Sequence, residues 1–249
     1  APLQSLLDMK VRNNFSEDYF DPHSDCYTEE IALGWRLPSN NMEKESTLVD
    51  FTNKITGFCD QENITVADYK SANTDVLTRI LAKCSPKSLA VHIEEIADAI
   101  GYEGAFHISL SPDGFPAFSG GGCLSARDLA RFGLIFARNG LDIHGNHFAN
   151  SSFLEKSLSR NAPSLTEPKK WLRYSNHLMT DGRFVGHAGY GGQFLLVDTL
   201  TKTSCSFLSV LENEDGYDES YVSEVATTLR KICTQQPLIQ SKWPKMPPG

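Results

Sequence analysis

The apolar positions in the front part of the chain recur every three or four residues, a spacing that is typical of amphipathic helices. Val76, Leu77 and Ile80 fall on one face of such a helix, and Ser71 stands where a capping side chain is expected. The same pattern predicts helices over residues 2–9, 71–83 and 85–100.

A further helix is predicted after the glycine-rich turn at residues 120–122. Ser125 and Asp128 form a start that resembles a capping box, with Asp in place of the usual Glu or Gln. Apolar residues continue on one side of this helix until Asn139-Gly140, a pair that is typical of a helix end.

Strand patterns appear first in the middle of the chain and dominate its C-terminal part. Turn residues in the middle of residues 105–118 predict a β-hairpin there. From residue 183 the apolar positions follow three short runs, which we interpret as successive antiparallel strands because short turns join them. These strands cover residues 183–187, 193–199 and 203–211, and an amphipathic helix over residues 218–233 follows them.

The change of pattern near residue 183 predicts the organisation of the chain. Residues 1–182 are expected to form a mostly helical lobe with the pocket loops, although residues 141–182 show no single period. Residues 183–236 would form the β-meander and closing helix of the same domain, and residues 237–249 a tail. The predicted class is α+β, with an antiparallel sheet, covering helices and a mostly helical lobe.

The composition narrows the range of partners. Lys and Arg number 23 against 31 Asp and Glu, a net charge of −8, so neither nucleic acid nor a membrane surface is an expected partner. No apolar run reaches the roughly 18–20 residues that a membrane helix needs. A secreted or periplasmic location is compatible with the sequence, which leaves the compartment and the oligomeric state open.

Three stretches and a fourth, weaker one stand in the order and at about the spacing of a known family. The first contains Leu-Leu-Asp-Met and Phe-Ser-Glu-Asp-Tyr-Phe-Asp-Pro within residues 6–22, and the second is Tyr-Lys-Ser-Ala-Asn-Thr-Asp-Val-Leu at residues 69–77. The third is Gly-His-Ala-Gly-Tyr-Gly-Gly-Gln at residues 186–193, and the fourth is the glycine turn and helix at residues 120–133. Together they resemble serine hydrolases of the β-lactamase and penicillin-binding-protein superfamily, in the branch of nylon-oligomer (6-aminohexanoate-dimer) hydrolases and related esterases.

The resemblance implies a β-lactamase/transpeptidase-like fold and a serine that an amide or ester substrate acylates. A serine hydroxyl is a weak nucleophile at its own pKa and needs a base beside it. In this family a Lys one helical turn after the Ser, and a Tyr that relays the proton, meet that need. Tyr69 matches this Tyr, and His187 stands on the strand that would form the opposite wall of the cleft. The backbone N–H of Tyr190 would supply half of an oxyanion hole.

The resemblance also implies residues that bind substrate. Ser71 and Asn73 would orient the catalytic tyrosine or hold the substrate, and Gly189 would let the substrate backbone approach closely. Tyr19 would line the pocket or, on an equally open interpretation, cover the core as a loop aromatic.

The Ser-x-x-Lys motif of the family does not occur in these 249 residues, because no Lys has a Ser three positions before it. The nearest patterns carry Thr instead and stand after the first motif, at residues 166–169, 199–202 and 228–231. The family places two strands and the nucleophile helix ahead of a segment such as Leu3–Met9. We therefore expect the fold in this chain to be incomplete at its N-terminus, with the nucleophile upstream of residue 1.

Two functions remain open. One is a hydrolase of small amides or esters that works through an acyl-enzyme and is inactive as this fragment. The other is a non-catalytic relative that keeps the fold as a binding or scaffold module. His187 stands where β-lactamases usually have Lys, which disfavours a β-lactamase but leaves nylon oligomers, carboxyl esters and peptides open. For either function, Tyr69 and His187 should face one cleft between the lobes.

No metal or organic cofactor is expected. His144 and His147 have a spacing that a metal can use, but their loop offers no third ligand. The glycine turn at residues 120–122 lacks the Lys-Ser/Thr that follows in a phosphate-binding loop. The six cysteines show no CxxC spacing, and we interpret them as small core residues.

Overall fold

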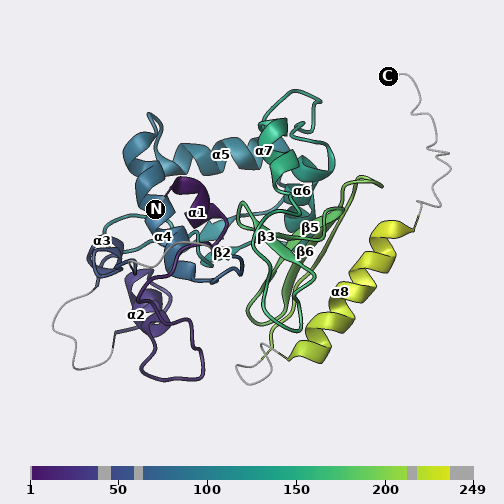
Figure 1. Cartoon of the computed structure of the whole chain (residues 1–249). Coiled ribbons are helices and arrows are strands. Elements are labelled where there is room, and N and C mark those ends of the chain that lie inside the picture. The colour runs from purple at the N-terminus through teal and green to yellow at the C-terminus, as the bar shows by residue number, and fades with distance from the viewer. Residues whose placement is uncertain (1, 39–45, 59–63, 212–217, 236–249) are drawn as a thin grey trace.

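The computed structural model describes residues 2–38, 46–58, 64–211 and 218–235, so the predicted tail at 237–249 lies outside the described residues. The described chain has the predicted α+β architecture, in which a five-stranded antiparallel sheet stands beside a helical lobe (Figure 1). None of the described helices is both long and apolar enough to cross a membrane.

The strands of the large sheet pair in sequence order, as a meander. The predicted strands 183–187, 193–199 and 203–211 correspond to β5 (Phe184–Gly189), β6 (Gln193–Asp198) and β7 (Thr203–Phe207), and all pairings are antiparallel. The third strand ends at Phe207, four residues before the predicted end. The meander prediction is therefore confirmed for these three strands.

Two further strands precede the predicted meander and extend its sheet. They are β3 (Arg173–Ser175) and β4 (Leu178–Thr180), joined by Asn176 and His177, which both have positive φ angles. β4 pairs with β5, so both belong to the large sheet. Strands of three residues are too short to show an alternating pattern, which is why the sequence did not predict them.

Helices cover both faces of the sheet. Leu195, Val197 and Ser204 lie on the face of α6 (Ala126–Ala137), where a Cβ added to Gly133 would stand 2.1 Å from Ser204 Oγ. The other face is covered by α8 (Glu219–Thr234), which runs along the sheet at its outer side (Figure 1). The predicted cap of α6 is confirmed, since Ser125 Oγ accepts a hydrogen bond from Asp128 N.

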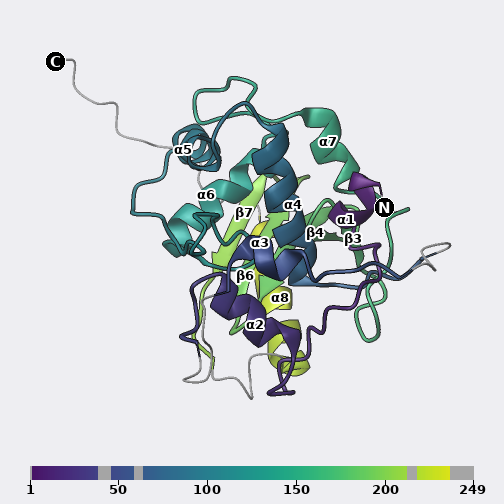
Figure 2. The ribbon, with the colours of Figure 1, turned by 90° about the vertical axis from the view of Figure 1, so that its left-hand side faces the viewer.

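The helical lobe lies on the side of the sheet away from α8, and Figure 2 shows α4 in front of the strands. The predicted helices 2–9, 71–83 and 85–100 are confirmed as elements, although the third begins later because Ser88, not Ser85, caps it. The helices α2, α3 and α7 were not predicted. The lobe contains α1 (Leu3–Leu7), α2 (Asp25–Ala32), α3 (Leu48–Thr52), α4 (Ser71–Cys84), α5 (Leu89–Ile100) and α7 (Ser151–Lys156).

The hairpin predicted over residues 105–118 forms only in part. Its turn is present, with a bridge between Leu110 and Pro116 and a hydrogen bond from Ser111 N to the Phe115 carbonyl. The first strand, β1 (His107–Ile108), instead pairs with β2 (Gly122–Cys123) of the glycine turn. The partner of β1 is therefore β2 and not the predicted second strand, because the chain reverses direction once more after the turn.

Candidate active site

A cavity of about 870 Å³ lies between the helical lobe and the sheet. The lobe contributes α2, the residues before α4 and the glycine turn, and the sheet contributes the end of β5. Six of the seven predicted site residues line this cavity, namely Tyr19, Tyr69, Ser71, His187, Gly189 and Tyr190. The seventh, Asn73, does not line it. Its side chain is buried, donates to Met9 Sδ and accepts from Asn13 Nδ2.

Tyr69 and His187 meet within this cavity, as the sequence predicts. Their ring centroids are 5.9 Å apart, although the residues come from opposite lobes. The ring of Tyr174, on β3, stands edge-on to both, at 5.9 Å from Tyr69 and 5.8 Å from His187. Tyr174 is almost fully buried, so it forms the floor of the group.

Hydrogen bonds define the protonation state of His187. Its Nδ1 lies 2.8 Å from the Ala188 carbonyl, which can only accept, so Nδ1 carries the proton. Its Nε2 lies 3.1 Å from the hydroxyl of Tyr174 and accepts from it. Burial lowers the pKa of His187, although the hydrogen bond to the Ala188 carbonyl acts to raise it. Burial raises the pKa of Tyr174 well above its ordinary value. At neutral pH the pair is therefore an uncharged imidazole and a protonated phenol.

The end of β5 is held by a tight turn at residues 190–192. Gly191 and Gly192 have φ angles of +72° and +85°, which favour glycine. The hydroxyl of Ser209 lies 3.0 and 2.9 Å from their carbonyl oxygens, and Tyr221 on α8 donates to that hydroxyl at 3.1 Å. The turn that places the backbone of Tyr190 is thus braced by α8.

We expect Gly192→Ala to cost more stability than Gly114→Ala. Both glycines have nearly the same φ, +85° and +84°, but a Cβ on Gly192 would stand 2.1 Å from Ser209 Oγ, whereas Gly114 has open space. Backbone strain costs roughly 1 kcal/mol at either site, and the crowding adds about 1–3 kcal/mol at Gly192. Urea unfolding measures both. Equal losses in the two variants would show that the turn is not tightly packed.

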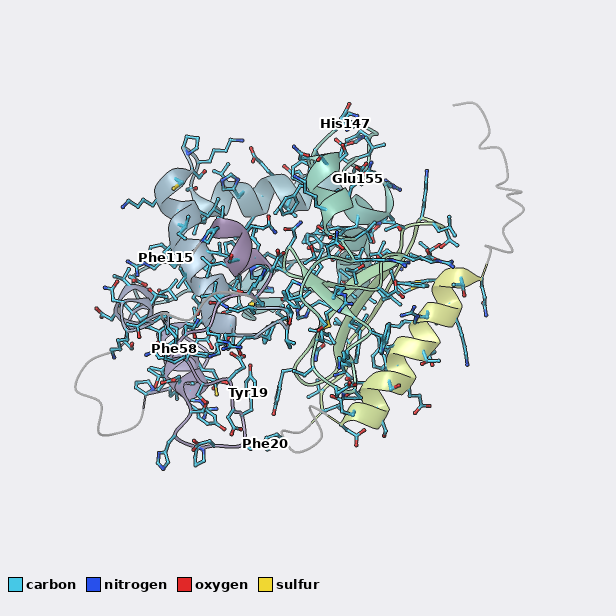
Figure 3. The ribbon with its side chains drawn as sticks, viewed as in Figure 1. Tyr19, Phe20, Phe58, Phe115, His147 and Glu155 are labelled. Carbon is cyan, nitrogen blue, oxygen red and sulfur yellow. The ribbon has the colours of Figure 1, made fainter. Side chains whose placement is uncertain are left out.

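Tyr19 contacts the same turn from the helical lobe. Its ring stacks on that of Tyr190, with centroids 5.1 Å apart and planes inclined by 27°. Its hydroxyl donates to Glu17 Oε1 at 2.6 Å, and its carbonyl accepts from Tyr27. Figure 3 shows Tyr19 next to Phe20 on the loop before α2. Tyr19 therefore forms part of the cavity wall and links the lobe to the turn.

Ser71 is tied into a group of buried acids beneath the cavity. Its Oγ lies 2.9 Å from Glu17 Oε2 and 2.6 Å from Glu29 Oε2, and its amide also donates to Glu17. One hydroxyl proton can serve only one of two carboxylates, so at least one acid of this group carries a proton. The Ser71 hydroxyl is thus engaged with the acids rather than directed into open space.

Asp75 completes this acidic group. Glu29 Oε1 and both carboxylate oxygens of Asp75 are buried and accept no hydrogen bond of standard geometry within the described residues, although the Ser119 hydroxyl is near enough to Asp75 to favour its ionised form. Burial, followed by the nearby Asp75, raises the pKa of Glu29 well above its ordinary value, and burial raises the pKa of Asp75 to about 6. A proton held between Glu29 and Asp75 supplies the donor that these oxygens need.

This arrangement predicts the pH dependence of stability. Because the pKa of Asp75 rises from 3.8 to about 6 on folding, the folded state keeps a proton that the unfolded state loses. The free energy of unfolding therefore falls as the pH rises from about 4 through 6. Asp75→Asn should remove this loss. The change that it makes in the free energy of unfolding should therefore be more favourable at pH 8 than at pH 4, by roughly 1–3 kcal/mol.

Urea unfolding of the variant and the unchanged protein at pH 4 and pH 8 measures the difference. Asp50→Asn, at an exposed aspartate on α3, is the matched control and should show no such pH dependence. If Asp75→Asn changed stability equally at both pH values, the raised pKa would be wrong.

The two loop histidines do not join this site. His147 lies at the opposite end of the molecule from Tyr19 (Figure 3). Within the described residues no three His, Cys, Asp or Glu side chains are grouped so that they could hold a metal ion. The residues that sequence reasoning missed are Tyr174 and the acids Glu17, Glu29 and Asp75. Of these, only Glu17 and Asp75 stand inside predicted motifs.

Comparison with known proteins identifies the fold first. The structure superposes on that of "Putative 6-aminohexanoate-dimer hydrolase from Bacillus anthracis", with a TM-score of 0.71 and 23% identity. The superposition covers 93% of this chain and 62% of that protein. The structure also resembles a "putative beta-lactamase from Bacteroides dorei DSM 17855", with a TM-score of 0.60 and 15% identity over 94% of this chain and 72% of the other. The fold is therefore that of the β-lactamase-like proteins.

The sequence comparison agrees with this fold. The chain is 27% identical over 158 residues to the 6-aminohexanoate-dimer hydrolase of Paenarthrobacter ureafaciens. The match spans 62% of this chain but only 38% of that enzyme. No family model matches the chain. The fold and the sequence match together support its assignment to the β-lactamase and penicillin-binding-protein-like superfamily of serine hydrolases.

Proposed function

We propose that the chain supplies one side of an acyl-transfer site that hydrolyses small amides or esters. The observation that carries this proposal is the meeting of Tyr69 and His187, from opposite lobes, in one cavity of about 870 Å³. Ligand sites in proteins typically measure about 300–1,000 Å³, so the cavity suits a small molecule. The sequence relative named 6-aminohexanoate-dimer hydrolase supports an amide substrate class.

Four residues of the cavity have roles in this proposal. Tyr69 relays the proton between the nucleophile and the leaving group. The backbone N–H of Tyr190 stabilises the oxyanion, and Gly189, which is exposed, leaves room for the substrate beside it. His187 is neutral and receives a hydrogen bond from Tyr174, so it positions the strand without adding a charge.

The nucleophile in this proposal is a Ser-x-x-Lys serine, which these 249 residues do not contain. An apolar cavity of about 530 Å³ adjoins His187 and Gly189 between α6, α7 and the sheet. A helix that carries the nucleophile could bury its apolar face there and reach Tyr69 from the side of His187. We therefore propose that the 249 residues are inactive alone and complete a site only with such a segment.

A panel of substrates tests this function on a form of the protein that carries Ser-x-x-Lys ahead of residue 1. We expect hydrolysis of short-chain p-nitrophenyl esters or of the linear 6-aminohexanoate dimer, lost when the motif serine is replaced by Ala. A chromogenic cephalosporin should remain intact, because His187 stands where β-lactamases usually have Lys. Tight binding of these compounds without turnover would instead favour the non-catalytic binding module.

A further inference from the structure

Two cysteine side chains lie together beneath α8, away from the cavity of the proposed function. Cys205 is on β7 and is half-buried, and Cys233 is in the last turn of α8 and is fully buried. The two residues are far apart in sequence, and α8 brings them together as it runs back along the sheet (Figure 1). Both are free thiols in the structure.

Three observations place both thiols on the same side of the sheet. Cys205 pairs with Leu196 in the register of β6 and β7, and Cys233 Sγ lies 3.7 Å from the Leu196 carbonyl. Ser204 faces α6, where Gly133 approaches it. Because side chains alternate along a strand, Cys205 faces the opposite way, toward α8.

The two thiols are also close enough to interact. Burial, and then the hydrogen bond to the Cys205 thiol, raises the pKa of Cys233 far above its ordinary value. Cys233 is therefore held as a protonated thiol, whereas Cys205 is the more accessible of the two. An oxidant from solvent would meet Cys205 first, and Cys233 is the thiol placed to resolve the product.

We propose that Cys205 and Cys233 are an oxidisable pair whose disulfide ties α8 to β7, with a small-molecule disulfide such as oxidised glutathione as the oxidant. In the first step the Cys205 thiolate attacks one glutathione sulfur, forms a mixed disulfide and releases one glutathione thiolate. In the second, Cys233 gives its proton to solvent, attacks the Cys205 sulfur and releases the second glutathione. The protein loses two hydrogens, and one glutathione disulfide is reduced to two thiols.

The proposed disulfide would hold α8 against the sheet, and contacts from α8 support the turn at the candidate site. Through Tyr221, the first turn of α8 holds Ser209, and Ser209 holds the carbonyls of Gly191 and Gly192. Arg230 of α8 also forms an ion pair with Asp181, just before β5. A covalent link at the far end of α8 would therefore keep the helix seated on the sheet when these weaker contacts open.

Peptide mapping of the unmodified sequence tests the proposal without relying on a variant. The reduced protein is incubated with oxidised glutathione, its remaining thiols are alkylated under denaturing conditions, and it is digested with trypsin. Cys205 and Cys233 fall in separate tryptic peptides, residues 203–230 and 232–242. We expect these two peptides to be joined, and the joined species to disappear after treatment with dithiothreitol.

Thermal unfolding gives an independent measurement. Closing the loop of 29 residues from Cys205 to Cys233 should raise the Tm by about 5–10 °C, and reduction should reverse the rise. Cys205→Ser should abolish both the joined peptide and the rise, whereas Cys84→Ser, at an exposed cysteine, should leave both unchanged. Recovery of Cys205 and Cys233 as alkylated or singly glutathionylated residues after oxidation would overturn the proposal, as would their pairing with other cysteines.

Discussion

Replacement of Tyr69 by Phe is expected to lower kcat/KM by about 10²–10⁴ in a form of the protein that carries the Ser-x-x-Lys nucleophile. The substitution keeps the ring, and with it the contacts to Tyr174 and His187, at 5.9 Å between centroids in each case. Only the phenolic oxygen is lost, and in the proposed function this oxygen moves the proton. The loss should therefore appear in kcat, with KM for a short-chain ester nearly unchanged.

Tyr27→Phe is the matched control for this experiment. Tyr27 lines the same cavity, and its hydroxyl donates to the carbonyl of Tyr19 at 2.9 Å, so it has no part in the proposed proton transfer. We expect less than about a threefold change in kcat/KM. The loss of one such hydrogen bond costs about 0.5–1.5 kcal/mol in stability, and it leaves the groups of the proposed proton transfer in place. If the two variants lost equal activity, the role proposed for Tyr69 would be wrong.

The second large expected effect is that the 249 residues alone should not turn over esters or amides. In a serine protease, removal of the nucleophile costs on the order of 10⁶ in kcat, because the base and the orienting groups act through it. In the proposed function, Tyr69 and the Tyr190 N–H could hold a substrate, but the 249 residues contain no Ser-x-x-Lys serine through which they could act. Initial rates with p-nitrophenyl butyrate should therefore equal those of a Tyr69→Phe preparation of the same chain. A rate that depends on Tyr69 in the 249-residue chain would contradict this expectation.

The long amphipathic elements could be predicted from the sequence. α4, α6 and α8 each present an apolar stripe over at least three turns, and the strands β5 and β6 are bounded by turn residues on both sides. Such elements carry enough positions for their period to be recognised. The short elements α3, β3 and β4 carried no comparable signal, since α3 has five residues and the two strands have three each.

The candidate site could be predicted only where its residues stood in motifs. The family resemblance brought together Tyr69 and His187, and the structure confirms that they share a cavity. Tyr174 stands outside every motif, on a strand that was not predicted, so its contact with His187 could not be foreseen. The roles of these residues in catalysis stay predictions.

The buried acids show a different limit of the sequence. Glu17, Glu29 and Asp75 come from a loop and two helices, and in sequence each looks like a solvated charge. Only the packing of α2 against the start of α4 makes them neighbours, through the hydroxyl of Ser71. Burial then changes their chemistry by raising the pKa of each, an effect that no local pattern encodes.

Covalent labelling tests the central proposal most directly. A fluorophosphonate is applied to the 249-residue chain and to a form that carries Ser-x-x-Lys ahead of it, and the labelled serine is identified by peptide mapping. We expect label only on the motif serine of the longer form, at a rate that Tyr69→Phe greatly slows. Label on any serine within the 249 residues, accompanied by esterase activity, would contradict the proposed division of the site.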